Sequence, residues 1–284
     1  MRRFLRKLFV WATAPEPVSR DFSRDLSAYP MLNALVEDVA AAYGKEQRPY
    51  YTWGMAHAAY LAQHLHIPRI TAIELGVAGG NGLVAMENAA TAIEQALGVD
   101  IDVVGFDSGA GLPPPQDIRD LPNLWSQGDF QMDKAALRAR LQRARLILGL
   151  VEDTIPDFLA SDHAPIGFIS FDLDLYSATV AALPLLEVRH GRILPRVQCY
   201  FDDILGFTFA EFNGERLAIR EFNDAHPQRQ ISPTYGARFY VPQRYVNANW
   251  TEKLFLAHIL DHPRYSDYDG LVRTPQLDID RNIR

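Results

Sequence analysis

Residues 70–82 read ITAIELGVAGGNG, a short apolar run that leads into a turn rich in glycine. The run at 70–75 combines β-branched and other apolar residues, a composition typical of a buried strand. Glycines in the turn let the backbone bend sharply and let a ligand approach the chain closely. Residues 81–97 form an alanine-rich pattern that Gly98 ends, which predicts a helix. A strand, a ligand-binding turn and a helix are therefore expected here.

The same alternation continues along the chain. Apolar runs predict further strands at 101–106, 146–150, 166–171 and 197–201, and periodic patterns predict helices at 31–43, 53–65, 134–143, 155–160, 179–186 and 215–225. Residues 237–241 and 253–259 are expected to form two late strands, or one strand and one helix. This alternation predicts an α/β fold with right-handed βαβ units and a mostly parallel sheet that helices cover on both faces.

Acidic residues lie at or just beyond the end of each predicted strand. In chain order they are Glu74, Asp107, Glu152 with Asp153, Asp172 with Asp174, and Asp202 with Asp203. Ligands of open α/β sheets bind beyond the carboxyl ends of the strands. We therefore expect these acids to border one binding site.

The glycine turn distinguishes two classes of cofactor. The nicotinamide fingerprint G-x-G-x-x-G holds a pyrophosphate at a helix N-terminus, and no register of the glycines in this turn gives that spacing. Glu74 would also repel a pyrophosphate, whereas it suits S-adenosylmethionine, which carries an ammonium and a sulfonium group. Asp107 can accept hydrogen bonds from both ribose hydroxyls. The turn therefore favours a methyl donor over a nicotinamide.

Composition limits the class of protein. The chain has 284 residues, 48% of them apolar, which is enough for one elaborated domain or two small ones. Its formal net charge of -7 argues against a dedicated nucleic-acid binder, which normally has a basic excess. Cys199 is the single cysteine, so the chain has no intrachain disulfide and no thiolate metal site. This composition fits a cytoplasmic protein.

The N-terminal segment MRRFLRKLFVWATAP alternates basic and apolar side chains. Its apolar part is too short to span a bilayer, which takes about 20 residues, and it lacks the features of a secretory signal. A basic amphipathic helix could make weak contact with an anionic membrane surface. The pattern favours a helix that packs on its own domain or on a partner subunit, and the second reading predicts a homo-oligomer.

Five sequence blocks together resemble the macrocin O-methyltransferase family. They are ELGVAGG at 74–80, FDSGAGLP at 106–113, GLVEDTIP at 149–156, DLDLYSAT at 172–179 and the pair Asp202-Asp203. The blocks follow the family's order over residues 70–205. The family consists of metal-dependent class I methyltransferases, typified by enzymes that methylate sugar hydroxyls on macrolides.

The resemblance implies a Rossmann-like sheet of seven strands with the last strand antiparallel. It implies a donor site with three parts: the turn residues Glu74, Gly76 and Gly80, then Asp107 and Ser108 at the ribose, then Asp153 or its neighbour Glu152 near the adenine edge. Family metal ligands match Asp172, Asp202 and Asp203. We expect residues 67–284 to form the methyltransferase domain and residues 1–66 to form an N-terminal helical segment that acts as a lid.

The three aspartates also indicate a metal from their chemistry alone. Carboxylates at adjacent strand ends repel one another unless a cation, a proton or distance relieves the repulsion. Oxygen ligands suit Mg²⁺, Ca²⁺ or Mn²⁺, with Mg²⁺ the expected ion. The alternative is an acidic rim with Arg or Lys partners. Asp172 is expected to be a ligand that also takes the proton of the acceptor, while Asp174 could instead be an acid held inward.

These observations predict an S-adenosylmethionine-dependent O-methyltransferase, assisted by a divalent cation, that acts on a hydroxyl of a sugar, glycan or other small molecule. Two alternatives stay open at this stage. One is a nicotinamide-dependent oxidoreductase, which the glycine spacing disfavours. The other is a protein that binds the donor without catalysis.

Overall fold

A computed structural model describes residues 28–44 and 48–267. The basic segment at the N-terminus, and with it the predicted membrane contact, lies outside these ranges. Within them, no helix combines the length and the apolar character needed to cross a membrane.

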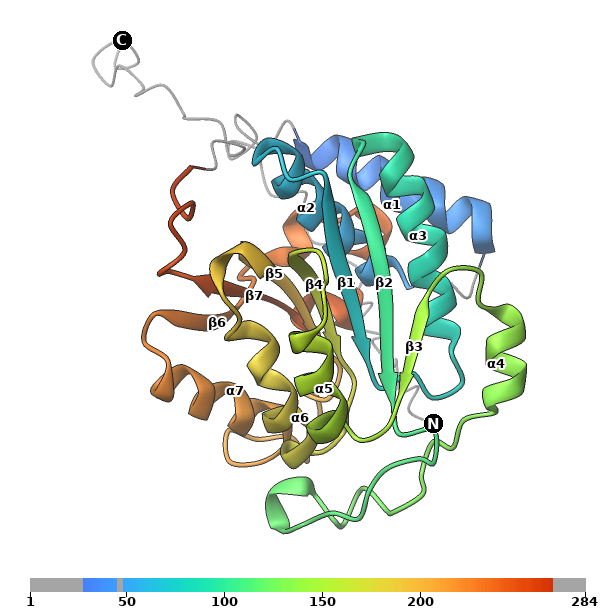
Figure 1. Cartoon of the computed structure of the whole chain (residues 1–284), viewed down its shortest axis with the longest axis vertical. Coiled ribbons are helices and arrows are strands. Elements are labelled where there is room, and N and C mark those ends of the chain that lie inside the picture. The colour runs from blue at the N-terminus through green and yellow to red at the C-terminus, as the bar shows by residue number, and fades with distance from the viewer. Residues whose placement is uncertain (1–27, 45–47, 268–284) are drawn as a thin grey trace, which may run out of the picture.

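The described residues form one seven-stranded sheet (Figure 1). Its strands are β1 (Arg69–Leu75), β2 (Asp100–Asp107), β3 (Arg145–Leu148), β4 (Ile166–Phe171), β5 (Ile193–Phe201), β6 (Arg229–Pro233) and β7 (Leu254–Ile259). Their spatial order is β3-β2-β1-β4-β5-β7-β6, and only β7 runs antiparallel to its neighbours. The predicted mostly parallel sheet with an antiparallel last strand is confirmed.

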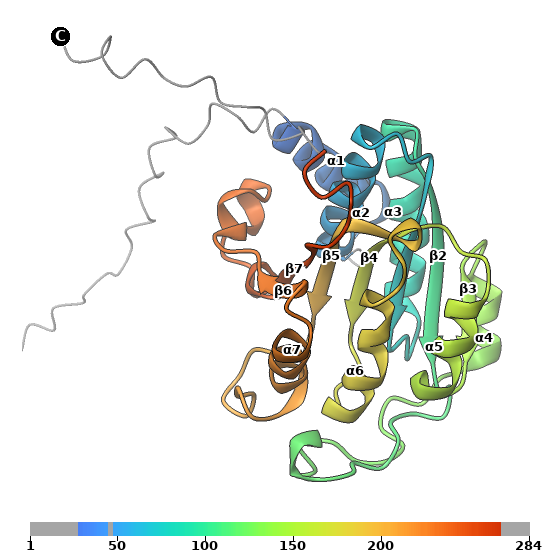
Figure 2. The same cartoon turned by 60° about the vertical axis from the view of Figure 1, so that its left-hand side comes forward.

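Helices cover both faces of the sheet (Figures 1 and 2). They are α1 (Ala28–Tyr43), α2 (Pro49–His64), α3 (Asn81–Leu97), α4 (Lys134–Arg140), α5 (Val151–Ala160), α6 (Tyr176–Ala182) and α7 (Gly214–Ala225), with short 3-10 helices between them. One hydrophobic core joins α1, α2 and α3 to the sheet, and a second joins α5, α6 and α7 to the opposite face. Strand β1 contributes side chains to both cores: Ile70 and Ala72 belong to the first, and Ile73 and Leu75 belong to the second.

Of the two arrangements expected for residues 237–241 and 253–259, the structure agrees with one helix, here a short 3-10 helix, and one strand, and it adds a strand that was not predicted. Residues 237–241 are not a strand: they begin with a 3-10 helix (Ala237–Phe239), and Ala237 and Val241 are buried in the core beside α1 and α2. The strand β6 at Arg229–Pro233 was not predicted, because its sequence RQISP contains one apolar side chain, Ile231. Residues 253–259 do contain a strand, β7.

Helix α2 packs directly against the sheet. A Cβ atom on Gly54 would lie 2.4 Å from the ring of Phe168 in β4, so the helix approaches the strand as closely as a glycine allows. Tyr51 and Trp53 are buried in the same core. The aromatic residues at the start of α2 therefore contribute to the core, while the division of the chain at residue 66 stays a prediction.

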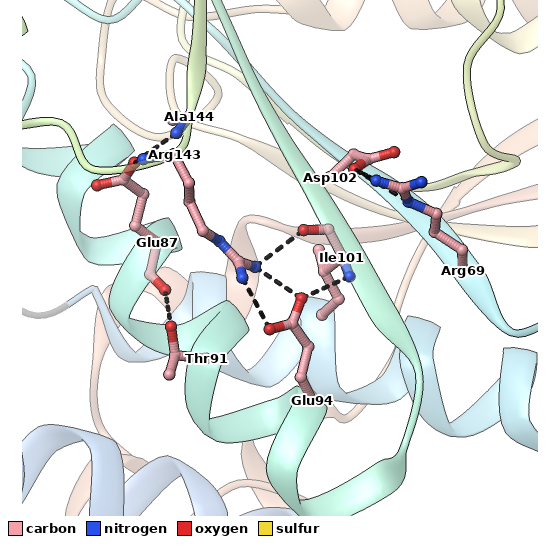
Figure 3. A network of polar contacts seen from close by, with 8 residues as sticks. All are labelled: Arg69, Glu87, Thr91, Glu94, Ile101, Asp102, Arg143 and Ala144. Carbon is pink, nitrogen blue, oxygen red and sulfur yellow. Dashed lines mark hydrogen bonds and ion pairs between the residues drawn. The ribbon is translucent and has the colours of Figure 1, made fainter.

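Acidic side chains of α3 hold the segment that enters β3 (Figure 3). The Glu87 carboxylate accepts hydrogen bonds from the backbone N–H groups of Gln142, Arg143 and Ala144. Glu94 pairs with the Arg143 guanidinium at 2.7 Å and accepts the N–H of Ile101, whose carbonyl Arg143 also contacts. These contacts tie the segment after α4 to α3 and satisfy the backbone groups of Ile101 at the start of β2.

Candidate active site

A cavity of about 340 Å³ lies at the carboxyl ends of the central strands. Its lining combines five elements of the predicted site: the glycine turn, the β2 end, the start of α5, the β4 end and the β5 end. The predicted residues that line it are Gly76, Asp107, Ser108, Glu152, Asp172, Asp174, Asp202 and Asp203. The topology thus gathers most of the acids that follow the strands around one cavity.

The glycine turn requires glycine at two positions. Gly76 has a φ of 83°, and a Cβ atom there would lie 1.8 Å from the carbonyl oxygen of Asp172. Gly80 has a φ of 80° at the start of α3, and its Cβ atom would collide with Leu137 of α4. Left-handed backbone of this kind favours glycine. The turn therefore sits tightly between the end of β4 and α4, and only Gly76 of the two lines the cavity.

Asp107 holds the glycine turn in place. Its Oδ2 atom accepts the N–H groups of Val77 at 2.9 Å and Ala78 at 2.8 Å, and its Oδ1 atom accepts the N–H of Gly109 at 2.6 Å. The carboxylate also borders the cavity. It is therefore fixed by three backbone donors in a position where it can face a ligand, and its contact with a ribose stays a prediction.

Glu74 lies behind the turn instead of lining the cavity. The side chain is 1% exposed, and its Oε1 atom accepts a hydrogen bond of 2.9 Å from the hydroxyl of Tyr51. Among the described residues, Oε2 has no hydrogen-bond partner. Burial raises the pKa of Glu74 to about 8. A Cβ atom on Gly82 would meet Oε1 at 1.7 Å, which explains the glycine in the first turn of α3.

The β2 and β3 ends contribute polar groups with different positions. Ser108 lines the cavity while its hydroxyl donates to the carbonyl of Gly111 at 2.7 Å. Glu152, in the first turn of α5, also lines the cavity, whereas Asp153 does not. Of the two acids considered for the adenine edge, the geometry therefore favours Glu152.

Asp172, Asp202 and Asp203 form an acidic cluster in which one carboxylate oxygen of each lies within 4.8 Å of the others. Burial and the nearby Asp202 carboxylate raise the pKa of Asp172 to about 6. Asp203 is buried, and its Oδ2 atom lacks a hydrogen-bond partner within the part of the chain that the structure describes. An all-oxygen set with a buried unpaired oxygen fits a hard divalent cation such as Mg²⁺.

Two cations that sequence reasoning missed accompany the acidic cluster. The Lys253 ammonium lies 2.8 Å from Oδ1 of Asp202, which also accepts the hydroxyl of Tyr200 at 2.8 Å. The Arg48 guanidinium lies 3.6 Å from Oδ2 of Asp172. The sequence left two alternatives for these aspartates, a cation site and an acidic rim with Arg or Lys partners. The structure has carboxylate oxygens close enough to share a cation and also has basic partners.

Asp174 is held inward, as the alternative prediction for this residue had it. It is 8% exposed with a φ of 64°, and the N–H of Leu175 bonds the carbonyl of Leu173 across it at 2.6 Å. Burial and then the neighbouring Asp203 raise the pKa of Asp174 well above its ordinary value. Buried Glu215 accepts the N–H of Asp203 at 2.9 Å.

Aromatic side chains from the long β2–α4 connection complete the cavity. This connection extends beyond the ends of β1 and β2 (Figure 1). Trp125 and Phe130 line the cavity and contact each other with ring centroids 5.9 Å apart. The indole N–H of Trp125 is buried without an acceptor in the described ranges. Trp125 and Phe130 lie in a turn-rich segment without a periodic pattern, so the sequence did not identify them as residues of the site.

Comparison with known proteins supports the fold. No family model and no curated protein matches the chain. Among solved structures, the O-methyltransferase NovP matches with a TM-score of 0.50 and 14% identity, covering 70% of this chain and 92% of that chain. CalS11, a calicheamicin methyltransferase, matches with a TM-score of 0.49 and 25% identity over 64% of this chain and 74% of that chain. An O-methyltransferase from Bacillus cereus in complex with SAH matches with a TM-score of 0.36, 17% identity and coverage of 80% and 89%.

The NovP match and the strand order together define the fold. The chain has the Rossmann-like class I methyltransferase fold that the sequence blocks predict. The narrower likeness to the macrocin family stays a resemblance of motifs.

Proposed function

We propose that this chain is an S-adenosylmethionine-dependent O-methyltransferase that acts on a hydroxyl of a sugar or another small molecule. The observation that carries the proposal is the joint lining of one cavity by Gly76, Asp107 and Asp172, at the carboxyl ends of adjacent parallel strands. Ligands of open α/β sheets bind at this edge. The fold shared with the O-methyltransferase NovP agrees with this activity.

The donor fits the charge and shape of the cavity. Acidic side chains dominate its polar lining, which favours a ligand with ammonium and sulfonium groups. Asp107 would accept the ribose hydroxyls, while Glu152 and the start of α5 would lie at the adenine. Gly76, which lines the cavity where the turn packs against the end of β4, would lie beneath the methionine part. Bound S-adenosylmethionine would supply a methyl group attached to a good leaving group.

Asp172 is the residue we propose to take the proton of the acceptor hydroxyl. Asp172 lines the cavity at the end of β4, and its carboxylate would accept that proton as the new carbon–oxygen bond forms. Holding acceptor and donor together in the cavity would supply much of the rate acceleration through proximity and orientation.

Asp172, Asp202 and Asp203 would hold a divalent cation. Their oxygens fit such an ion in chemistry and in spacing. When bound, the ion would orient acceptor oxygens and lower the pKa of a hydroxyl. Arg48 and Lys253 would limit the charge of the cluster while the ion is exchanged.

Calorimetry with the full chain tests the proposed function directly. S-adenosylhomocysteine is expected to bind with one-to-one stoichiometry, and NADH to give no heat beyond dilution. Incubation with methyl-labelled S-adenosylmethionine and pools of sugar nucleotides or phenolic glycosides should then transfer label to an acceptor. Absence of binding by both S-adenosylmethionine and S-adenosylhomocysteine would sink the proposal.

A further inference from the structure

Arg48 is the one cationic side chain among the described residues that line the cavity. It directly precedes α2, and its side chain is 29% exposed. The other charged residues of the lining are all acidic: Asp107, Glu152, Asp172, Asp174, Asp202 and Asp203. A single positive group in an acidic cavity needs a chemical reason.

The proposed donor provides that reason, because its charges are not all positive. Its sulfonium and ammonium groups suit the carboxylates, but its α-carboxylate would be repelled by Asp172 and its neighbours unless a cation stood between them. Arginine presents a planar fork of N–H donors that matches a carboxylate in two parallel hydrogen bonds. We propose that Arg48 binds the α-carboxylate of S-adenosylmethionine, an inference that rests on the proposed function.

The position of Arg48 agrees with this role. Its Nη1 atom lies 3.3 Å from the hydroxyl of Tyr51 and 3.6 Å from Oδ2 of Asp172. Tyr51 is in turn bonded to Glu74 beneath the glycine turn. The guanidinium is therefore held between the glycine turn and the β4 end, where the methionine part of the donor would lie. The 3.6 Å contact to Asp172 is long for a charged hydrogen bond, so a ligand carboxylate can compete for the guanidinium.

The start of α2 adds to the positive potential around Arg48. Among the described residues, which do not include 45–47, this helix has no acidic side chain in its first turn and no side-chain cap at its N-terminus. The partial positive charge of this helix end is therefore not neutralised within its first turn. Arg48 and the N-terminus of α2 would both attract an anion.

Lys253 offers a matched comparison within the same acidic cluster. Its ammonium contacts Asp202 at 2.8 Å, its side chain is 13% exposed, and it is not part of the cavity lining. Removing either cation changes the net charge near the cluster equally. Only Arg48 is positioned to contact the ligand.

The test is calorimetry on the full chain with two ligands. One is S-adenosylhomocysteine, and the other is its decarboxylated analogue S-adenosyl-3-thiopropylamine, which keeps the ammonium and lacks the carboxylate. The R48M variant is expected to lose about 10- to 100-fold in affinity for S-adenosylhomocysteine, the effect of removing a charged hydrogen-bond partner. The affinity of R48M for the analogue should stay within about threefold of wild type. K253M should not weaken S-adenosylhomocysteine more than it weakens the analogue. R48K should lose less affinity for S-adenosylhomocysteine than R48M, because it keeps the charge, and more than wild type, because it lacks the two parallel hydrogen bonds.

Equal weakening of both ligands by R48M would overturn the proposal, since Arg48 would then act through the fold or through Asp172. Should R48M fail to fold, judged by its thermal unfolding, R48K together with R48Q decides the same comparison of ligands. If the wild-type chain binds neither ligand, the proposed function fails and the role of Arg48 fails with it. If instead the wild-type chain binds both ligands and R48M weakens them equally, only the Arg48 proposal fails.

Discussion

The hydroxyl of Tyr51 donates a 2.9 Å hydrogen bond to the buried carboxyl group of Glu74. The same hydroxyl accepts a hydrogen bond of 2.8 Å from Ser170. One side chain of α2 thus joins the ends of β1 and β4 beneath the glycine turn. The helix that precedes the sheet in sequence is therefore part of the support of the candidate active site.

Removing the Tyr51 hydroxyl should destabilise the protein. In Y51F, Glu74 loses the donor to Oε1 in a fully buried setting, which typically costs about 1–3 kcal/mol. Urea denaturation of the variant and of wild type measures this difference. Y43F provides the control, because Tyr43 is 45% exposed at the end of α1 and should change the unfolding free energy very little. Equal stability of Y51F and wild type would contradict the role of this bond.

Glu74 should contribute a loss of folding stability as the pH rises from about 4.5 to about 8. Burial raises the pKa of Glu74 from 4.5 to about 8, so in this window the folded state holds a proton that the unfolded state has released. Such a group lowers the unfolding free energy by up to about 1.4 kcal/mol for each pH unit. E74Q should make the dependence shallower by removing this one titration. Urea melts at pH 5, 6, 7 and 8 measure the slope, and an unchanged slope in E74Q would show that Glu74 titrates normally.

Substitution of Gly76 should damage the donor site far more than substitution of Gly79. G76A places a methyl group 1.8 Å from the Asp172 carbonyl oxygen and forces alanine into a φ of 83°. Backbone strain of this kind alone costs about 1–3 kcal/mol. A Cβ atom on Gly79 meets nothing within 4 Å. We expect G76A to lose more than tenfold in affinity for S-adenosylhomocysteine by calorimetry, and comparable losses in both variants would refute the argument.

The acidic cluster should bind a divalent cation that D203N binds more weakly. Loss of a ligand oxygen is expected to lower affinity for Mn²⁺ at least about tenfold, by comparison with the effect of changes around metal ligands. Electron paramagnetic resonance of titrated Mn²⁺ measures the bound fraction without any reference to activity. D162N serves as a control, since Asp162 precedes β4 at the opposite end of the sheet and is exposed. Full methyl transfer after stringent EDTA treatment would exclude a metal role.

His57, a partly buried residue of α2, should make the fold sensitive to acid. Burial lowers the pKa of His57 from 6.5 to about 4, so between these values the unfolded chain binds a proton that the folded chain does not. His57 should therefore contribute a loss of stability as the pH falls from about 6.5 to about 4, by up to about 1.4 kcal/mol for each pH unit. H57F should reduce this loss in thermal unfolding between pH 7 and pH 5. The exposed neighbour His64 is the control position.

Local patterns predicted the parts of the structure that depend on local chemistry. The central parallel strands β1, β2 and β4 were recognised because their buried faces produce continuous apolar runs. Acids beyond those strands were recognised as a site because parallel strands end at one edge. β6 escaped notice because it is an edge strand that ends in Pro233, and such strands need few apolar residues.

The partners of the acids could not be predicted in the same way. Arg48 stands before a helix and Lys253 before β7, and neither belongs to a motif. Their proximity to Asp172 and Asp202 arises from the packing of α2 and from the insertion of β7 beside β5. Contacts between distant parts of the chain carry no signature in a single sequence.

The insertion of β7 between β5 and β6 has a consequence for biosynthesis. Lys253 reaches Asp202 only when the final strand has entered the interior of the sheet, and Arg48 belongs to the first part of the domain to leave the ribosome. Pairing that spans such a length of chain forms late and slowly. A nascent chain that stops before β7 would expose the unpaired edges of β5 and β6 and would leave Asp202 without Lys253. The charge balance beside the candidate site would therefore be complete only after β7 has joined the sheet.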